Sequence, residues 1–369
     1  YVIDRATGEL LSAEKYVEAT WASHVDLESG RPVETENADH RSEARMTRPA
    51  PFGGHSWHPM AYSAGTGLVY IPAMENQAEY STPEVFNYVP GGHWNLAQAD
   101  VVMAPPMGEA LVRGVVKRLM KGHLLAWDPS AQKEVWRVPQ SSMWNGGLLA
   151  TAGGLVFQGS GDGHLYAYRA DTGQRLWQGR AGSGVVAPPV TYEIDGEQYV
   201  AVMAGWGGAA PLTFDMPDTA RGQPGRLLVF KLDGDATLPP PVPAPEPVQP
   251  PPRTGSEETV RRGEYLYAEH CGRCHGSALM SSAVVPDLRL LSEAKHAVFR
   301  NIVLDGILQG TGMAGFADVL NGEDADAIQA YVLDVANGHW DEAQVPGWWR
   351  EFKAWVLDLV AALIAWFLG

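Results

Sequence analysis

The chain has 369 residues, enough for two or three domains with sizeable cores. Its 27 Lys and Arg against 43 Asp and Glu give a formal net charge of −16, so nucleic acid is not expected as a partner. An apolar fraction of 45% excludes a disordered chain, and 41 Gly and 27 Pro favour a turn-rich β fold. The two Cys residues exclude a disulfide framework. Because the sequence begins at Tyr1, without an initiator Met or a signal peptide, we expect a processed product or a fragment.

An internal repeat organises the first two thirds of the chain. Residues 122–127 (GHLLAW) are echoed 41 residues later by 163–168 (GHLYAY), and a third copy occupies 225–230 (GRLLVF). Trp136 and Trp177 follow the first two copies at the same spacing. Apolar strands with Gly-bearing turns at a period of about forty residues are typical of four-stranded propeller blades. A Trp at fixed phase would fill the gap between neighbouring blades.

Each repeated strand is preceded by another apolar run, expected to be its neighbour in the sheet, at residues 67–73, 154–160 and 198–204. The pattern therefore predicts about three blades and a fragment of a fourth. Propellers typically have four to eight blades, so we expect an incomplete ring. The alternative is a β-sandwich with accidental similarity between its strands.

A Pro-rich segment follows the repeat. Nine of the 14 residues from 239 to 252 are Pro, a composition that favours a semi-rigid polyproline II spacer of roughly 40 Å at about 3.1 Å per residue. We therefore assign residues 1–235 to the propeller blades, 236–254 to a linker, 255–340 to a second domain and 341–369 to a C-terminal helix.

Both cysteines lie in one motif, Cys271-Gly-Arg-Cys274-His275, which matches the C-x-x-C-H signature for attachment of c-type haem. Thiols one helical turn apart can each form a thioether to a vinyl group of the porphyrin, and the adjacent His then reaches the iron. A half zinc site would need further thiolates or a spaced His pair. A redox dithiol would follow a strand in a βαβ pattern, which is absent.

The sixth iron ligand is expected from a distant loop. Met280 is too near the motif to reach the opposite face of the haem, whereas Met313 lies 38 residues after His275 in a Gly-rich loop. A Met/His pair raises the reduction potential and suits electron transfer. The alternative is that Met313 belongs to the core. His270, His296 and His339 are expected to be surface or structural residues.

Two helices are predicted around the motif. Residues 256–269 form the first, with a Ser as N-cap, and residues 321–336 form the second, with acidic residues in its first turn and one apolar face. Gly263 on the first helix would let Tyr331 of the second pack closely. The dipeptide Asn337-Gly338 is expected to end the second helix.

The order of these parts resembles the soluble quinohaemoprotein alcohol dehydrogenases, which use pyrroloquinoline quinone (PQQ). The resemblance covers residues 1 to about 340. The most specific matching stretches are 53–60 (GGHSWHPM), 144–154 (WNGGLLATAGG), 184–189 (GVVAPP) and 204–208 (AGWGG). It implies the C-terminal half of such an enzyme: all-β blades of an incomplete eight-bladed propeller, followed by a small all-α cytochrome c domain.

In that family, PQQ lies in a funnel at the propeller centre. By resemblance, Ser56 and Trp57 take the place of an Asn-Trp pair that holds the edge of PQQ, and Trp144 and Trp206 approach the cofactor. Ser56 is a departure from the family pattern, because its side chain is shorter. The alternative is that these Trp residues serve only blade packing.

The resemblance implies a periplasmic oxidoreductase acting on a small alcohol. An Asp accepts the hydroxyl proton while hydride passes to a quinone polarised by Ca²⁺, and haem c passes the electrons to a soluble cytochrome, a copper protein or a membrane quinone. The catalytic Asp and the Ca²⁺ ligands would precede Tyr1. Two alternatives stay open: a non-enzymatic propeller scaffold with an electron-transfer domain, and a relative that oxidises a cyclic amine or a polymer.

The last segment, 348–369, contains clustered Trp and ends in eleven uncharged residues, 359–369. That run is shorter than the roughly twenty residues needed to span a hydrocarbon core. Clustered Trp with a few charges is typical of a helix at a membrane interface. We therefore expect this segment to contact a membrane surface or a partner, with packing on the propeller as the alternative.

Overall fold

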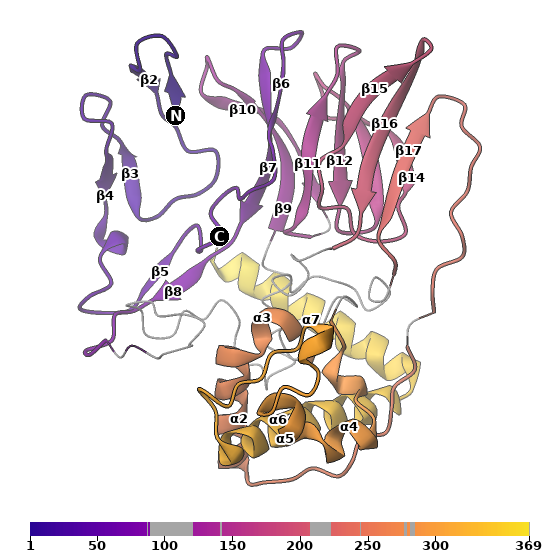
Figure 1. Ribbon diagram of the computed structural model, residues 1–369. Helices are drawn as coiled ribbons and strands as arrows, with labels where there is room; N and C mark the ends of the chain where they lie inside the picture. Colours follow the sequence, from indigo (N-terminus) through magenta and orange to yellow (C-terminus); the bar gives the residue numbers. More distant parts are fainter. Residues whose placement is uncertain are drawn as a thin grey trace.

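The computed structural model describes residues 1–86, 88, 121–140, 142–206, 223–243, 245–276, 279–280 and 285–368. Three antiparallel sheets stand side by side, and a group of helices lies beneath them (Figure 1). Most of the insertion between Met74 and Lys121, for which the sequence gives no clear pattern, lies outside the described residues.

The three sheets correspond to the repeated strands. The first, in the order β10-β9-β7-β6, contains β6 (Ala61–Ser63), β7 (Leu68–Glu75), β9 (Lys121–Asp128) and β10 (Lys133–Gln140). The second contains β11 (Asn145–Ala150), β12 (Leu155–Ser160), β13 (His164–Arg169) and β14 (Arg175–Arg180). The third contains β15 (Val190–Ile194), β16 (Glu197–Ala204) and β17 (Arg226–Lys231). Every pairing within these sheets is antiparallel, and all but one join consecutive strands; β7 pairs with β9 because β8 lies in another ladder. This arrangement confirms the prediction of successive blades.

Three shorter ladders occupy the N-terminal part. They pair β1 (Val2–Ile3) with β2 (Leu10–Ser12), β3 (Ala22–Val25) with β4 (Pro32–Glu34), and β5 (Arg45–Thr47) with β8 (Ala78–Tyr80). A 3-10 turn, η1 (Glu36–Ala38), separates β4 from β5.

The recurrent Trp residues pack between blades, as predicted. Trp136 on β10 donates a hydrogen bond from Nε1 to the carbonyl of Ala170 in the next blade, 3.2 Å away. A Cβ added to Gly173 would lie 2.6 Å from the Trp136 ring, so this glycine, with φ of 72°, makes room for the indole. Trp177 on β14 meets Phe230 on β17 edge to face, with ring centroids 5.1 Å apart. The 41-residue repeat is therefore a repeat of inter-blade contacts.

The Pro-rich segment contacts both parts of the molecule. Near its start, the backbone N–H of Val242 donates to Oε1 of Gln223 over 3.0 Å. Near its end, Asn337 Nδ2 donates to the carbonyl of Pro251 over 2.9 Å, and Arg253 forms ion pairs with Asp334 and Asp341.

The helical part begins with α2 (Glu257–His270) and α3 (Gly272–His275). It continues with η5 (Leu288–Leu290), α4 (Glu293–Ala297), α5 (Phe299–Val303), η6 (Gln309–Thr311), α6 (Gly322–Ala343) and α7 (Gly347–Leu368). Both predicted N-termini are confirmed: the hydroxyl of Ser256 accepts from the N–H of Thr259, and Asn321 forms a capping box with Asp324.

Helices α2 and α6 pack against each other at Gly263. A Cβ at this position would lie 1.8 Å from the carbonyl oxygen of Ala327 and 3.0 Å from Cβ of Tyr331, so only glycine allows the contact. Tyr267 and Tyr331 pack beside it with ring centroids 5.3 Å apart. The predicted close approach of α2 and α6 is confirmed.

The predicted end of the second helix is wrong. Helix α6 continues through Asn337-Gly338 to Ala343, because the Asn337 amide donates to the carbonyl of Leu333 within the helix instead of capping its end. A single Gly inside a helix costs only about 1 kcal/mol, and a Cβ at Gly338 would meet no atom. The actual C-cap is Gln344.

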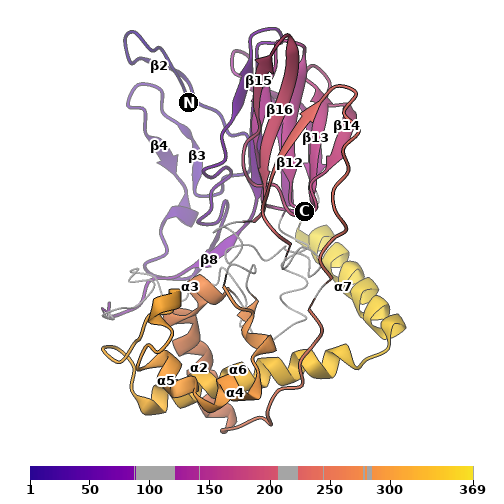
Figure 2. The same cartoon turned by 45° about the vertical axis from the view of Figure 1, so that its right-hand side comes forward.

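Helix α7 follows α6 closely and runs from the helical part toward the base of the sheets (Figure 2). Lys353 of α7 lies 3.7 Å from Glu342 of α6, an ion pair between the two helices. In the described part of the chain, no helix has the length and apolarity required to cross a bilayer.

Candidate cofactor sites

The C-x-x-C-H motif lies where α2 gives way to α3. Cys271 is the C-cap of α2, and its N–H donates to the carbonyl of Tyr267. The hydroxyl of Tyr267 in turn donates to the carbonyl of Gly276 over 2.6 Å, so one buried tyrosine holds both ends of the motif. Gly276 has φ of 74°, a left-handed conformation that favours glycine. The motif is therefore a rigid turn, and its two sulfurs are not bonded to each other.

His275 is buried and oriented for metal binding. Its Nδ1 lies 3.2 Å from the carbonyl oxygen of Pro286, which can only accept, so Nδ1 is the protonated nitrogen and Nε2 presents a lone pair. Burial lowers the pKa of His275, which favours the neutral ring that binds metals.

The surroundings of Cys271 are apolar. Its sulfur belongs to a cluster with Tyr267, Leu279 and Phe299, and burial raises the pKa of the thiol to about 12. An environment that disfavours a thiolate suits an uncharged thioether better than a zinc ligand or a redox dithiol. The described residues contain no group of three or more His, Cys, Asp or Glu side chains placed to hold a metal ion. Cys274 is exposed, which leaves its sulfur accessible to a porphyrin vinyl group.

Met313 lies in a loop fixed at both ends. Before it, Gly312 adopts φ of 99°, and the N–H of Met313 donates to the carbonyl of Leu308. After it, the N–H of Phe316 donates to the carbonyl of Val303 on α5 over 2.8 Å. The side chain of Met313 is half-buried. Its assignment as the sixth ligand stays a prediction.

Two of the three Trp residues predicted to contact PQQ, Trp144 and Trp206, fall into one cluster, and Trp57 lies beside it. Trp144 and Trp206 are buried together with Met74, Met143 and Val186, and Phe52 packs against them. Trp57 is 54% exposed, and its ring centroid lies 6.3 Å from that of Trp144. Ser56 is half-buried beside Trp57 in the chain. Ser56, Trp57, Trp144 and Trp206 thus lie on or beside one aromatic surface, which is formed by the three Trp rings.

Three ring nitrogens at this surface are buried without a hydrogen-bond partner: Nε1 of Trp144, Nε1 of Trp206 and Nε2 of His58. Leaving a buried donor unpaired costs about 1 to 3 kcal/mol, so such groups need an explanation. A polar, planar cofactor would satisfy them, and this feature fits PQQ. Gly184 accommodates the Trp206 indole, because a Cβ there would lie 2.3 Å from the ring.

Sequence reasoning missed Asn76 and His58. The Asn76 side chain accepts from the N–H of Ala50 over 2.6 Å and donates to the carbonyl of Gly53 over 3.1 Å, so it anchors the loop that leads to Ser56 and Trp57. Its partners are 23 to 26 residues away, and no local pattern signals them.

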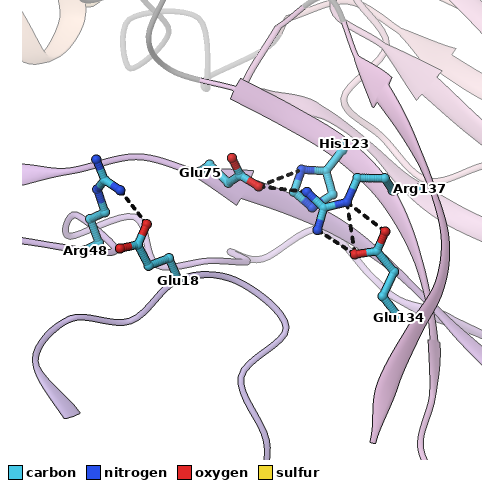
Figure 3. A network of polar contacts seen from close by, with 6 residues as sticks. All are labelled: Glu18, Arg48, Glu75, His123, Glu134 and Arg137. Carbon is cyan, nitrogen blue, oxygen red and sulfur yellow. Dashed lines mark hydrogen bonds and ion pairs between the residues drawn. The ribbon is translucent and has the colours of Figure 1, made fainter. Parts of the chain in front are cut away.

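A polar network lies next to this anchor (Figure 3). Glu75, which precedes Asn76, lies 3.0 Å from Arg137 and 3.7 Å from Nδ1 of the buried His123, and Arg137 also pairs with Glu134. On the other side, Arg48 pairs with Glu18. These contacts tie the end of β7 to β9 and β10 and so support the loop that Asn76 holds.

His58 is 2% exposed, and its ring stacks on Trp57 with centroids 4.0 Å apart. Burial lowers its pKa from 6.5 to about 4. As the pH falls below 6.5, His58 is protonated in the unfolded chain but stays neutral in the folded chain. The free energy of unfolding therefore declines until the pH approaches 4. We expect His58 to contribute up to about 2 kcal/mol of the stability lost between pH 7 and pH 5.

The check is denaturant unfolding of the wild-type protein and His58→Phe at both pH values. The variant keeps an aromatic ring but cannot titrate, so its stability should change less between the two values. An equal change in both proteins would contradict the lowered pKa of His58.

Comparison with known proteins agrees with this geometry. A family model for the β-propeller domain of glucose, ethanol and alcohol dehydrogenases of the PQQ type matches residues 120–200, and a model for subunit III of cbb3-type cytochrome c oxidase matches residues 258–332. The quinohemoprotein alcohol dehydrogenase ADH IIB of Pseudomonas putida is 46% identical over 337 residues. Close homologues of this chain are quinohaemoprotein alcohol dehydrogenases. The alignment covers 90% of this chain and 47% of ADH IIB, so the chain spans about half the length of the curated relatives it matches.

Solved structures of quinohaemoprotein alcohol dehydrogenases share the fold. That of ADHIIG from Pseudomonas putida HK5 matches with a TM-score of 0.84 at 39% identity, over 95% of this chain and 52% of that one. That of the Comamonas testosteroni enzyme matches with a TM-score of 0.74 at 33% identity, over 94% and 49% of the two chains. The predicted fold class, blades of a propeller followed by a helical cytochrome c domain, is confirmed.

Proposed function

We propose that this chain is the C-terminal half of a PQQ-dependent alcohol dehydrogenase that passes electrons to a covalently bound haem c. The observation that supports it most is the haem motif: two sulfurs one turn apart, followed by a buried His275 whose Nδ1 faces a carbonyl and whose Nε2 is left for iron. The unpaired ring nitrogens of Trp144 and Trp206 support a polar cofactor, such as PQQ, at the Trp cluster.

Each predicted residue then has a role. Cys271 and Cys274 would form the thioethers that attach the haem, and His275 and Met313 would bind its iron. Ser56, Trp57, Trp144 and Trp206 would hold PQQ, with the unpaired ring nitrogens available to its polar groups and the apolar cluster excluding water. When bound, the two groups supply hydride acceptance and single-electron transfer. We assign no catalytic carboxylate and no Ca²⁺ ligand to the described residues.

The test is reconstitution of the full-length protein. PQQ and Ca²⁺ are added to the apoprotein, and a small primary alcohol should then reduce the haem, seen as a band at about 550 nm. Trp144→Phe, which keeps a ring but removes Nε1, should weaken PQQ binding about tenfold, the loss of one buried hydrogen bond. Failure of every alcohol to reduce haem that dithionite does reduce would favour a scaffold or a different donor.

A second proposal concerns location: a periplasmic protein whose helix α7 lies on the membrane surface. Five exposed apolar side chains follow one another at spacings of three or four residues, which places them on one face of the helix over roughly 22 Å. They are Trp348, Phe352, Trp355, Leu359 and Leu363. Trp side chains favour the interface between headgroups and acyl chains. A helix at this surface would bring the haem domain near a membrane quinone.

We expect the variant Trp348→Ser/Phe352→Ser/Trp355→Ser to lose at least about tenfold in binding to phospholipid vesicles, because burial of each ring contributes more than 1 kcal/mol. Flotation with vesicles measures this. The control is Glu351→Ser/Asp358→Ser, which changes two exposed charges on the same helix and should still float. Equal flotation of the triple variant and the wild type would contradict the proposal.

A further inference from the structure

A buried ion pair lies directly after the carbonyl that orients His275. Asp287 and Arg289 have side chains only 15% and 10% exposed. Arg289 Nη2 lies 2.6 Å from Asp287 Oδ2, and Nε lies 3.0 Å from Oδ1. The same carboxylate accepts from the backbone N–H of Arg289 and caps η5. This is a two-point contact between a guanidinium and a carboxylate, the arrangement with the most fixed geometry.

The pair is seated on helix α6. Arg289 Nη1 lies 3.4 Å from Nδ1 of His339, and Leu288 between the paired residues packs against the core cluster of the helical part. The segment is therefore held from two sides, by a polar contact to α6 and by an apolar contact to the core.

Pro286, which accepts from Nδ1 of His275, is the residue immediately before Asp287. Any movement of the ion pair would move this carbonyl. Asp287 is thus linked to the predicted iron ligand through the backbone carbonyl of Pro286.

We infer that the Asp287–Arg289 ion pair is a positioning and charge-balancing element that sets the reduction potential of the haem bound at His275. This inference rests on the proposed attachment of haem c. Oxidised haem has one more positive charge than reduced haem, so a nearby negative charge favours the oxidised form and a nearby positive charge favours the reduced form. In the intact pair the two effects largely cancel.

Charge balance and packing make different predictions for single substitutions. Asp287→Asn leaves the guanidinium uncompensated and should raise the potential. Arg289→Met leaves the carboxylate uncompensated and should lower it. We expect shifts of about tenfold in the ratio of oxidised to reduced haem at a fixed applied potential, equal to 59 mV for a one-electron couple. The double variant should return close to the wild-type value.

Potentiometric titration of the haem-loaded full-length protein measures these shifts. The matched control is the exposed pair of Arg300 and Asp326 in the same domain, with side chains 57% and 48% exposed, where Arg300→Met should leave the potential unchanged. Arg289→Lys keeps the positive charge and should have a haem potential near that of the wild type. This variant tests the role of the charge if Arg289→Met does not fold.

Single variants that shift the potential in the same direction, or not at all, would overturn the inference and leave a packing role. If the wild-type protein carries covalent haem but the single variants behave in this way, the inference is contradicted and the proposed function is not. A wild-type protein that matures without covalent haem contradicts the proposed function, and the inference with it.

Discussion

Met313→Ala should lower the reduction potential of the haem and open the sixth coordination site. The thioether of methionine is a soft, neutral ligand that favours the reduced iron, and its loss leaves water or nothing in its place. We expect a shift of at least about a hundredfold in the redox equilibrium, or ~120 mV. Potentiometric titration gives the potential, and binding of carbon monoxide to the reduced protein reports the open site.

Met280→Ala is the matched control. Met280 is also half-buried, but it lies five residues after His275 and should not reach the opposite face of the haem. The reduced Met280→Ala protein should bind no carbon monoxide, and its haem should keep the wild-type reduction potential. If Met313→Ala behaved like this control, another ligand would be required. His296 would then be the first residue to test, because it is buried and both of its ring nitrogens are without a hydrogen-bond partner.

The sequence was sufficient wherever structure follows from local pattern. The runs that form β9 and β13 recur 41 residues apart, and a third copy forms β17, so the blades could be predicted. The packing of Trp136 against the next blade could be predicted as well, because Trp136 and Trp177 follow their strands at the same spacing. The haem motif is local too, since its chemistry depends on the spacing of three residues.

Features that depend on partners far apart in the chain could not be predicted. Asn76 differs in no local respect from an ordinary turn residue, and its role follows only from the position of the loop at 50–53. The unpaired nitrogen of His58 is defined by burial, which periodicity does not reveal in an irregular loop. The end of α6 was mispredicted because Asn-Gly is a frequent stop signal, whereas here the Asn337 side chain donates back into the helix.

Gly263→Ala should unfold the helical part or loosen it severely. The added methyl would lie 1.8 Å from the carbonyl oxygen of Ala327 and 2.5 Å from its carbonyl carbon, and both are backbone atoms that cannot rotate away. Helices α2 and α6 would have to separate, which opens the core around Tyr267 and Tyr331. We expect a loss of at least about 3 kcal/mol, because overpacking costs 1 to 3 kcal/mol even where flexible side chains can yield. Denaturant unfolding followed by haem absorbance measures it.

Gly338→Ala separates this packing effect from helix propensity. Gly338 lies inside α6, and a Cβ there meets no atom within 4 Å. Alanine should therefore stabilise the same domain by about 0.5 to 1 kcal/mol, since it loses less backbone entropy than glycine on entering a helix. Both glycines lie inside helices, but only Gly263 faces backbone atoms of a neighbouring helix. A loss of stability in Gly263→Ala and a gain in Gly338→Ala would therefore locate the effect at the α2–α6 contact. A neutral Gly263→Ala would mean that the two helices do not pack this closely, and the haem motif that follows α2 would lose the support on which its geometry depends.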